Sequence, residues 1–425
     1  MIKQFIICPE HLFRRHFKSE KKNSMRREIS QILKAFVEIP SVNPGDFRLE
    51  EDSSFGEANF VDYVYEIFCT KGYYCEKQEV LPGRCNLLIH MSECLGEKPI
   101  VLFQTHSDVV DAKEMEGAFS PKIHEGKLWG RGSCDAKGQL CAMLLVMEQL
   151  KEQKENLSFD LCLSLCCDEE FKHRGVDEFL NWEYKDKVVF AVVGEPTELR
   201  LASACKGSIR FCIETTGIAA HTSMPEKGEN AIYLMAKIIR IFQNKIEKRT
   251  VCRNDSECGN ATVAVSLIKG GTIVNSVPDN CVIHIDRRMI PGETWETVYQ
   301  EIKNMVCEEL SENEKTRVIF QKPYLTDPSY GIKLEEDMKR SIGEVLKKHN
   351  LNEKIIGLPY GCDASKLAKW EIPVFVFGAG SIKQAHTKEE YIEIDQIVKA
   401  SEVLKDLVLN LTEKESNYGG FGRNN

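Results

Sequence analysis

The segment Ile100-Val-Leu-Phe-Gln-Thr-His-Ser-Asp108 carries the pattern that decides the fold class. Its first part, Ile100–Gln104, is a short run typical of a buried strand, and His106 and Asp108 follow at the carboxyl end of that run. Strands whose two faces are both covered by helices are nearly continuous apolar runs. The segment therefore predicts an α/β fold with a largely buried sheet, and it places two metal-binding residue types at one end of a strand.

Three further apolar runs end in the same way. In open α/β sheets, ligands bind beyond the carboxyl ends of the strands. One acidic residue after a strand is more often part of a solvated turn, but four strand ends that all present histidine or carboxylate indicate a metal site. The three runs and the residues that follow them are Leu161–Leu165 with Asp168, Glu169 and Glu170, Val188–Val193 with Glu195, and Val374–Phe377 with His386.

A glycine-containing loop lies between the first two of these runs. It is Gly130-Arg-Gly-Ser-Cys-Asp135-Ala-Lys-Gly138, and a predicted helix follows it directly. Asp135 then has two interpretations. It could be the N-cap of that helix, or a carboxylate whose two oxygens each face one metal ion. The loop alone leaves both open.

The length of 425 residues allows two domains. Between residues 208 and 320 we expect strand, helix, strand, strand, helix and strand, the order of a ferredoxin-like β-α-β-β-α-β domain. Helices and strands alternate before and after it. The prediction is one α/β domain with a mixed central sheet, interrupted by a small inserted domain. The predicted parts are an N-terminal extension (1–24), the first part of the α/β domain (25–203), the inserted domain (204–322), the second part of the α/β domain (323–412) and a disordered tail (413–425).

The composition excludes several classes of protein. Lys and Arg total 56 against 65 Asp and Glu, so the formal net charge is -9, which argues against nucleic acid as a partner. No apolar run approaches the roughly 18 residues of a membrane span. The 17 cysteines include no C-x-x-C, which favours reduced thiols and a cytoplasmic location over a disulfide scaffold. Residues 1–24 are rich in basic side chains, and a transit segment or a plain extension would both account for them.

Five ordered motifs resemble those of the di-zinc aminoacylase/carboxypeptidase family, a group of metallopeptidase-type enzymes. The resemblance covers about residues 25–412, including the inserted domain. The motifs are His106-Ser-Asp108, the glycine loop 130–138, Glu169-Glu170, Gly194-Glu-Pro196 and the late His386.

The resemblance implies a metal site with two zinc ions, for which cobalt or manganese could substitute. Asp135 would bridge the ions. His106 and Glu195 would complete one site, and Glu170 and His386 the other.

Two further acidic residues have implied roles beside the metals. Asp108 would accept the ring N–H of His106 and fix its tautomer. Glu169 would be the general base.

The resemblance also implies that the inserted domain is a lid that joins two subunits into a homodimer. The matching substrate-binding residues are His221, which would stabilise the oxyanion, Asn275 and Arg287, which would bind a substrate carboxylate, and Gly361 and Cys362, which would line the pocket. Arg288 is the alternative to Arg287 for the carboxylate contact.

The implied reaction is hydrolysis of the amide bond of an Nα-acyl amino acid. Glu195 and the ending Gly378–Asp395 look most like acetylornithine deacetylases, which release acetate and ornithine in arginine biosynthesis. A succinyl-diaminopimelate desuccinylase, a general aminoacylase or a dipeptidase would use the same metal chemistry. A non-catalytic binding protein of the same fold is the alternative from another class, and the presence of Glu169 beside a full set of ligands argues against it.

Overall fold

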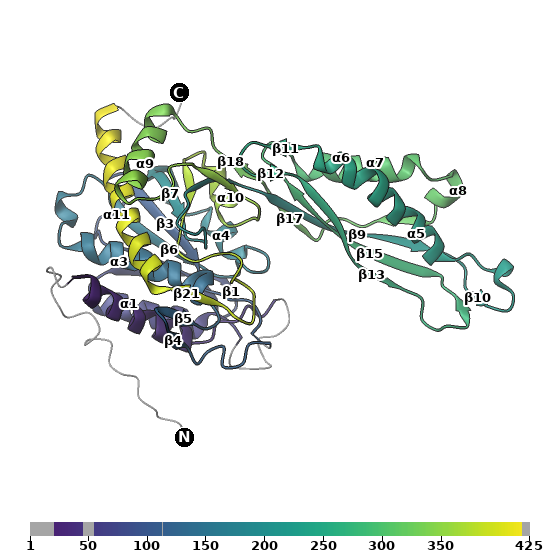
Figure 1. Ribbon diagram of the computed structural model, residues 1–425, viewed down its shortest axis with the longest axis horizontal. Helices are drawn as coiled ribbons and strands as arrows, with labels where there is room; N and C mark the ends of the chain where they lie inside the picture. Colours follow the sequence, from purple (N-terminus) through teal and green to yellow (C-terminus); the bar gives the residue numbers. More distant parts are fainter. Residues whose placement is uncertain (1–20, 46–54, 113, 419–425) are drawn as a thin grey trace, which may run out of the picture. The chain divides into compact units, whose positions relative to one another are not determined.

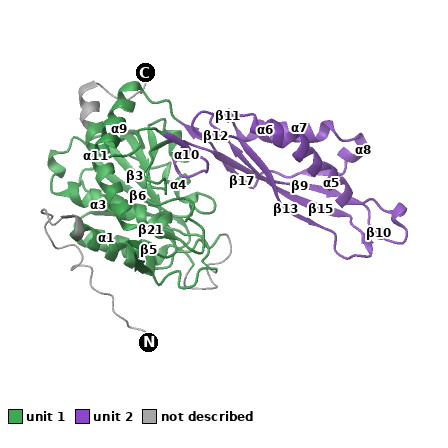
Figure 2. Ribbon diagram, in the orientation of Figure 1, with its two compact units in different colours: residues 1–202, 332–355, 366–425 green, residues 203–331, 356–365 purple. Residues whose placement is uncertain are grey.

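The computed structural model describes residues 21–45, 55–112 and 114–418, and it divides into two compact units (Figure 2). The second unit contains Ser203–Gly331 and Ile356–Ser365, and the first contains the rest. Each unit is described by itself below.

The first unit is built on a mixed β-sheet (Figure 1). Strand β3 is parallel to β6 and β7, and β20 is parallel to β7, whereas β1 and β2 pair antiparallel with each other and β2 pairs antiparallel with β6. All residues of β3 are buried, as expected for a strand with both faces covered. The strands lie in the order β1 (Tyr74–Leu81), β2 (Arg84–His90), β6 (Asp160–Cys166), β3 (Ile100–His106), β7 (Val188–Val193) and β20 (Val374–Val376).

The register of the parallel strands aligns their carboxyl ends. His106 at the end of β3 is opposite Cys166 of β6, and Val193 at the end of β7 is opposite Gln104 of β3 and Val376 of β20. The loops that follow these four strands therefore leave the same edge of the sheet.

Helices of the first unit pack with the sheet into one hydrophobic core. Helix α3 contacts α1 and α11, and α11 also contacts α9. The helix α3 is buried almost throughout, because its residues are apolar on nearly every side. The helices of this unit with at least six residues are α1 (Lys21–Glu38), α2 (Ala58–Thr70), α3 (Gly138–Lys151), α4 (Arg174–Phe179), α9 (Glu336–Lys348) and α11 (Ile394–Tyr418).

The predicted ends of the chain need one correction. Helix α11 continues to Tyr418, so the prediction of a disordered tail from residue 413 is wrong for residues 413–418. The sequence prediction ended this helix where its apolar spacing ends, but the polar residues that follow include good helix formers. Helix α1 begins at Lys21, inside the predicted extension 1–24. Residues 1–20 and 419–425 lie outside the described residues.

The second unit contains an antiparallel sheet in the order β13-β15-β9-β16. Strand β15 alternates between buried and partly exposed residues, and its buried residues belong to one hydrophobic cluster with those of α5 and α7. The main elements follow the chain as β9 (Gly207–Thr216), α5 (Ala231–Ile241), β13 (Thr262–Gly270), β15 (Asn280–Met289), α7 (Trp295–Glu308) and β16 (Val318–Phe320).

The two units divide the chain differently from the predicted domains. Residues 323–331 and 356–365 were expected in the α/β domain and lie in the second unit. Backbone pairing accounts for the difference, because β17 (Leu325–Asp327) pairs with β9, and β18 (Tyr330–Gly331) and β19 (Ile356–Leu358) pair with β8 (Ala202–Cys205).

None of the helices in the described part of the chain is long and apolar enough to cross a membrane.

Candidate metal centre

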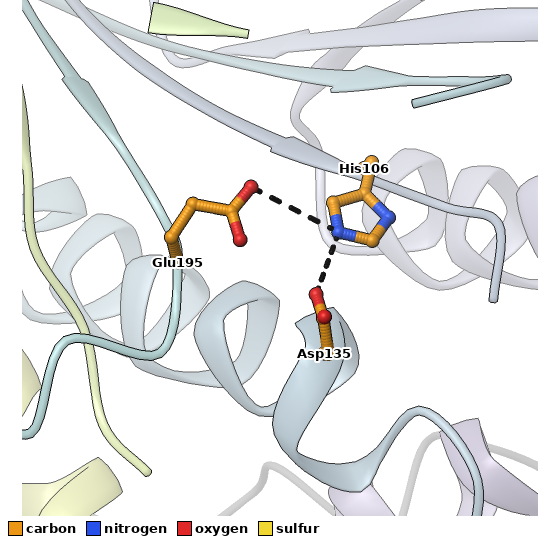
Figure 3. A group of neighbouring side chains, drawn as sticks. All are labelled: His106, Asp135 and Glu195. Atoms are coloured by element: carbon orange, nitrogen blue, oxygen red, sulfur yellow. Dashed lines mark hydrogen bonds and ion pairs between the residues drawn. The ribbon is translucent and has the colours of Figure 1, made fainter. Parts of the chain in front are cut away.

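The first group of metal-binding side chains lies at the carboxyl edge of the parallel strands. His106 ends β3, Glu195 follows β7, and Asp135 lies just before helix α3 (Figure 3). The Nε2 atom of His106 is 3.0 Å from Oδ1 of Asp135 and 4.0 Å from Oε1 of Glu195. All three side chains are buried.

A second group shares Asp135 with the first. The Nε2 atom of His386 is 3.2 Å from Oδ2 of Asp135 and 3.0 Å from Oε2 of Glu170. One oxygen of Asp135 thus faces His106 and the other faces His386, which is the arrangement of a bridging carboxylate. The N-cap of α3 is Lys137, without a side-chain capping bond, so Asp135 does not serve as the cap.

The donor atoms fit two metal ions. Within each group they lie within 4.8 Å of one another. A tetrahedral ion with bonds of about 2.0–2.1 Å would separate its ligand atoms by about 3.3 Å. One imidazole and two carboxylates at each position suit zinc, with the fourth position open for water or substrate.

The orientation of His106 is set by the residue two positions after it. Nδ1 of His106 is 2.9 Å from the backbone carbonyl of Asp108, whereas the Asp108 carboxylate is 3.6 Å away. The acceptor of the ring N–H is therefore the carbonyl and not the carboxylate that the sequence predicted. A proton fixed on Nδ1 leaves the Nε2 lone pair for a metal.

The carboxylate of Asp108 holds the backbone that carries the other acidic residues. It accepts the backbone N–H of Glu169 at 3.1 Å and that of Glu170 at 3.0 Å, and an N–H of the Asn43 side chain at 2.7 Å. Asp108 thereby fixes the predicted base and a predicted ligand together.

A buried ionic network behind Asp108 was missed by the sequence analysis. Asp168 accepts hydrogen bonds from Asn43 at 3.1 Å and from Arg84 at 3.0 Å, and Arg84 donates to Glu57 at 2.7 Å. Arg174 also donates to Asp168. No spacing in the sequence connects Asn43, Glu57 and Arg84 with Asp168, because they come from distant parts of the chain and meet only through the tertiary fold.

Glu169 lies close enough to the first group to influence it. Its negative charge is one of the causes that raise the pKa of His106. Oε1 of Glu169 is 3.7 Å from Nδ1 of His173, a buried residue to which the sequence analysis assigned no role.

The neighbouring carboxylates favour the doubly protonated, positively charged form of both imidazoles when no cation is bound. Hydrogen bonds to Asp135 and Glu170 raise the pKa of His386 to about 11. Burial would lower the pKa of His106, but the neighbouring carboxylates of Asp108 and Asp135 raise it well above its usual value. Burial would likewise raise the pKa of Asp135, and the two histidines lower it instead.

The predicted substrate-binding residues all lie in the second unit. His221 and Asn275 are neighbours there: β10 (Ala220–His221) pairs with β14 (Ser276–Val277), and the N–H of Thr222 donates to the carbonyl of Asn275. Nδ1 of His221 accepts the backbone N–H of Ser223, so the neutral ring carries its proton on Nε2. Gly361 and the buried Cys362 follow β19.

The two neighbouring arginines of β15 differ in their surroundings. Arg287 is buried, and its Nη2 lies 2.7 Å and 3.0 Å from the two carboxylate oxygens of Glu293. Arg288 points to the opposite face of the strand, retains 30% of its side-chain exposure, and pairs with Asp286. The guanidinium of Arg287, which the sequence analysis assigned to the substrate carboxylate, is therefore bound by Glu293, a residue of the same unit.

Comparison with known proteins identifies the family. The family model described as peptidase family M20/M25/M40 matches residues 102–410, and the chain belongs to this family of hydrolases. The acetylornithine deacetylase of Buchnera aphidicola subsp. Acyrthosiphon pisum (strain Tuc7) is 25% identical over 385 residues, which cover 89% of this chain and 96% of that protein. A probable succinyl-diaminopimelate desuccinylase of Staphylococcus aureus (strain MSSA476) is 26% identical over 415 residues, with the same coverage.

Solved structures share the fold. A tripeptidase from Staphylococcus aureus subsp. aureus Mu50 superposes with a TM-score of 0.71 at 19% identity, covering 92% of this chain and 99% of that chain. The YXEP protein of Bacillus subtilis, described as a dinuclear metal-binding peptidase of the M20 family, gives 0.67 at 14% identity, with coverage of 92% and 99%. These likenesses agree with the resemblance inferred from the motifs.

The raised pKa values predict that metal binding releases protons. The raised pKa values of His106 and His386 favour the cationic form of both imidazoles in the cation-free protein, and each must lose its extra proton to become a ligand. We expect release of about two protons when two zinc ions bind, and an affinity that rises with pH. Calorimetry in buffers of different ionisation enthalpy measures the release, and an affinity that does not change between about pH 6 and about pH 8 would contradict the assignment of the histidines as ligands.

Proposed function

We propose that this chain is a di-zinc hydrolase that removes the acyl group from an Nα-acyl amino acid, with N-acetyl-L-ornithine as the first candidate substrate. The observation that carries the proposal is the position of Asp135, whose two oxygens face two separate histidine–glutamate pairs. The relatives named as a deacetylase and a desuccinylase support the substrate class. N-succinyl-diaminopimelate, other N-acyl amino acids and dipeptides are the alternative substrates.

The proposed reaction adds water across the amide bond. When bound, the two ions supply Lewis acidity that makes water a better nucleophile and the carbonyl a better electrophile. Glu169 accepts a proton from the water as its oxygen bonds to the carbonyl carbon, and returns it to the leaving nitrogen as the C–N bond breaks. The hydrogen bond from the N–H of Glu169 to Asp108 holds the backbone at this base in place.

The second unit supplies the proposed contacts to the rest of the substrate. The Nε2–H of His221 is a suitable donor to the negative charge that develops on the carbonyl oxygen, because Nδ1 is engaged as an acceptor. Asn275 lies beside it and would donate its side-chain amide, and the segment with Gly361 and Cys362 would line the pocket.

For the substrate carboxylate we favour Arg288 over Arg287. Arg287 is buried against Glu293, and a substrate would have to displace that carboxylate to reach the guanidinium. Arg288 is partly exposed, and its partner Asp286 lies on the same face of the strand. A guanidinium binds a carboxylate through two parallel hydrogen bonds.

The second unit is also the proposed lid and dimer interface. Its principal elements follow the order strand, helix, strand, strand, helix, strand, and β13 lies at the edge of the sheet. Leu267 and Ile268 of that strand are 63% and 58% exposed. An open edge with exposed apolar side chains is a surface for pairing with a second copy. The mass of the purified protein in solution, measured by light scattering, tests for the dimer, and a monomer at micromolar concentration would argue against it.

A hydrolysis panel tests the proposed function. We expect the zinc- or cobalt-loaded protein to hydrolyse N-acetyl-L-ornithine, and a chelator to abolish the activity. The panel also contains N-acetylcitrulline, N-succinyl-diaminopimelate, N-acetylmethionine and several dipeptides, each of which would redefine the substrate if it were hydrolysed fastest. A protein that binds metal and turns over none of them would be a binding relative and not an enzyme.

The role of Glu169 is tested by replacing its carboxylate with an amide of the same shape. Glu169→Gln should keep both metal ions, because Glu169 belongs to neither of the two groups that share Asp135, and should lower kcat by about 100- to 10,000-fold because the amide cannot accept the proton. Metal content and kcat are measured on the same sample. A kcat near that of the unchanged protein would remove Glu169 from the mechanism.

The two arginines give a matched pair of variants. Arg288→Met should lower kcat/KM by about 10- to 100-fold with little change in the thermal midpoint, since a charged hydrogen bond to the substrate is lost. Arg287→Met should mainly lower the thermal midpoint, because it removes a buried partner of Glu293. If Arg287→Met lowered kcat/KM and Arg288→Met did not, Arg287 would be the substrate contact.

A further inference from the structure

A buried glutamate without a role in the proposed reaction contacts the loop that carries Asp135. Glu390 is 1% exposed and lies four residues after His386 along the chain. Its Oε2 accepts from Nη1 of Arg131 at 2.7 Å and from the backbone N–H of Gly132 at 3.0 Å. Its Oε1 accepts the backbone N–H groups of Cys134 at 2.9 Å and of Asp135 at 3.1 Å.

We propose that Glu390 is a positioning residue that holds Asp135 where its two oxygens can bridge two cations, and that it fixes the spacing between Asp135 and His386. The inference rests on the proposed di-zinc function. It assigns to Glu390 no contact with metal or substrate.

The four hydrogen bonds use the full accepting capacity of the carboxylate. Each oxygen has two lone pairs, and each receives two donors. An ionised carboxylate is the only protein side chain that accepts at both ends without presenting a donor of its own. Three of the four donors are backbone groups, so Glu390 fixes the path of the main chain and not only one side chain.

The backbone of this loop departs from helical geometry at Asp135 and Ala136, within the π-helical turn Ser133–Lys137. Gly132 has φ +82°, and a Cβ there would lie 2.6 Å from Cγ1 of Val109, so the chain passes close to a neighbour in a conformation suited to glycine. Because this backbone leaves helix and sheet geometry, its N–H groups need other acceptors. Glu390 provides them for Gly132, Cys134 and Asp135, whereas the N–H of Ser133 donates to the carbonyl of Gly130.

The same segment connects the loop to the second histidine ligand. The N–H of Gly130 donates to the backbone carbonyl of Glu390 at 3.1 Å, and β21 (Tyr391–Glu393) pairs with β5 (Lys127–Trp129). Main-chain and side-chain hydrogen bonds of Glu390 therefore join the chain before Asp135 to the chain after His386. A shift of Glu390 would change the distance between these two predicted ligands of the second ion.

Glu390→Gln tests the proposal through metal affinity. The amide keeps the volume but turns two N–H donors toward two donors of the loop. We expect zinc affinity, measured by competition with a chromophoric chelator, to fall by about 10- to 100-fold, as is usual when a group behind the metal ligands is removed. The visible spectrum of the cobalt-loaded protein should change as well, because the bridging carboxylate is displaced.

Asp160→Asn is the matched control. Asp160 is also a buried carboxylate that accepts a backbone N–H, that of Gly96 at 3.3 Å, but it lies at the amino end of β6, away from the site. The zinc affinity and the cobalt spectrum of the Asp160→Asn variant should equal those of the protein without substitutions. A loss in this variant as large as that in Glu390→Gln would show a general effect of damage to the core and overturn the proposal.

If Glu390→Gln does not fold, Arg131→Gln tests the role proposed for Glu390 in its place. This variant removes one donor and leaves the three backbone hydrogen bonds, so zinc affinity should fall, but less than in Glu390→Gln. An unchanged zinc affinity would count against the proposal.

Zinc binding by the protein without substitutions distinguishes a failure of the proposed function from a failure of the role proposed for Glu390. If it binds no zinc, the proposed function fails. If it binds two ions and Glu390→Gln binds both equally well, only the role of Glu390 is overturned.

Discussion

The burial of several carboxylates at one edge of a sheet is the constraint on which the rest of the first unit depends. Asp108, Asp135, Glu195 and Glu390 are all buried there, and Glu170 joins them through His386. Buried like charges repel strongly and are stable only when hydrogen bonds and positive charge compensate them. Asp108 and Glu390 are compensated by backbone N–H groups and by Asn43 and Arg131. Asp135, Glu170 and Glu195 face two imidazoles, and the proposed pair of divalent cations would add further positive charge there.

The parallel register brings these groups together from distant parts of the chain. Strands β3, β6, β7 and β20 end at one edge, and each is followed by a residue of the site. The loops themselves have no regular geometry, so a second set of residues holds them. Asp108 binds the backbone of Glu169 and Glu170, and Glu390 binds the backbone before and at Asp135. The precision of the site therefore comes from carboxylates that bind main chain as much as from those that face the two histidines.

Much of the fold and of the candidate site could be predicted from the sequence where a local pattern decides the structure. Helix α3 (Gly138–Lys151) directly follows the glycine loop, as predicted, and β7 coincides with the predicted apolar run Val188–Val193, because apolar spacing alone identifies a buried helix and a buried strand. The ligands could be proposed because each follows such a strand. The hairpin β1–β2 was missed, since β1 is largely polar and exposed. Glu390 was missed for a related reason: it follows Glu389, an exposed residue of the same type, and only the tertiary fold distinguishes them.

Diffraction measured on both sides of the zinc absorption edge, from crystals of the zinc-loaded protein, tests the central claim most directly. The account predicts two anomalous peaks about 3.5–4 Å apart, one on each side of the Asp135 carboxylate, with His106 at one and His386 at the other. A single peak, or two peaks that do not share Asp135, would contradict it.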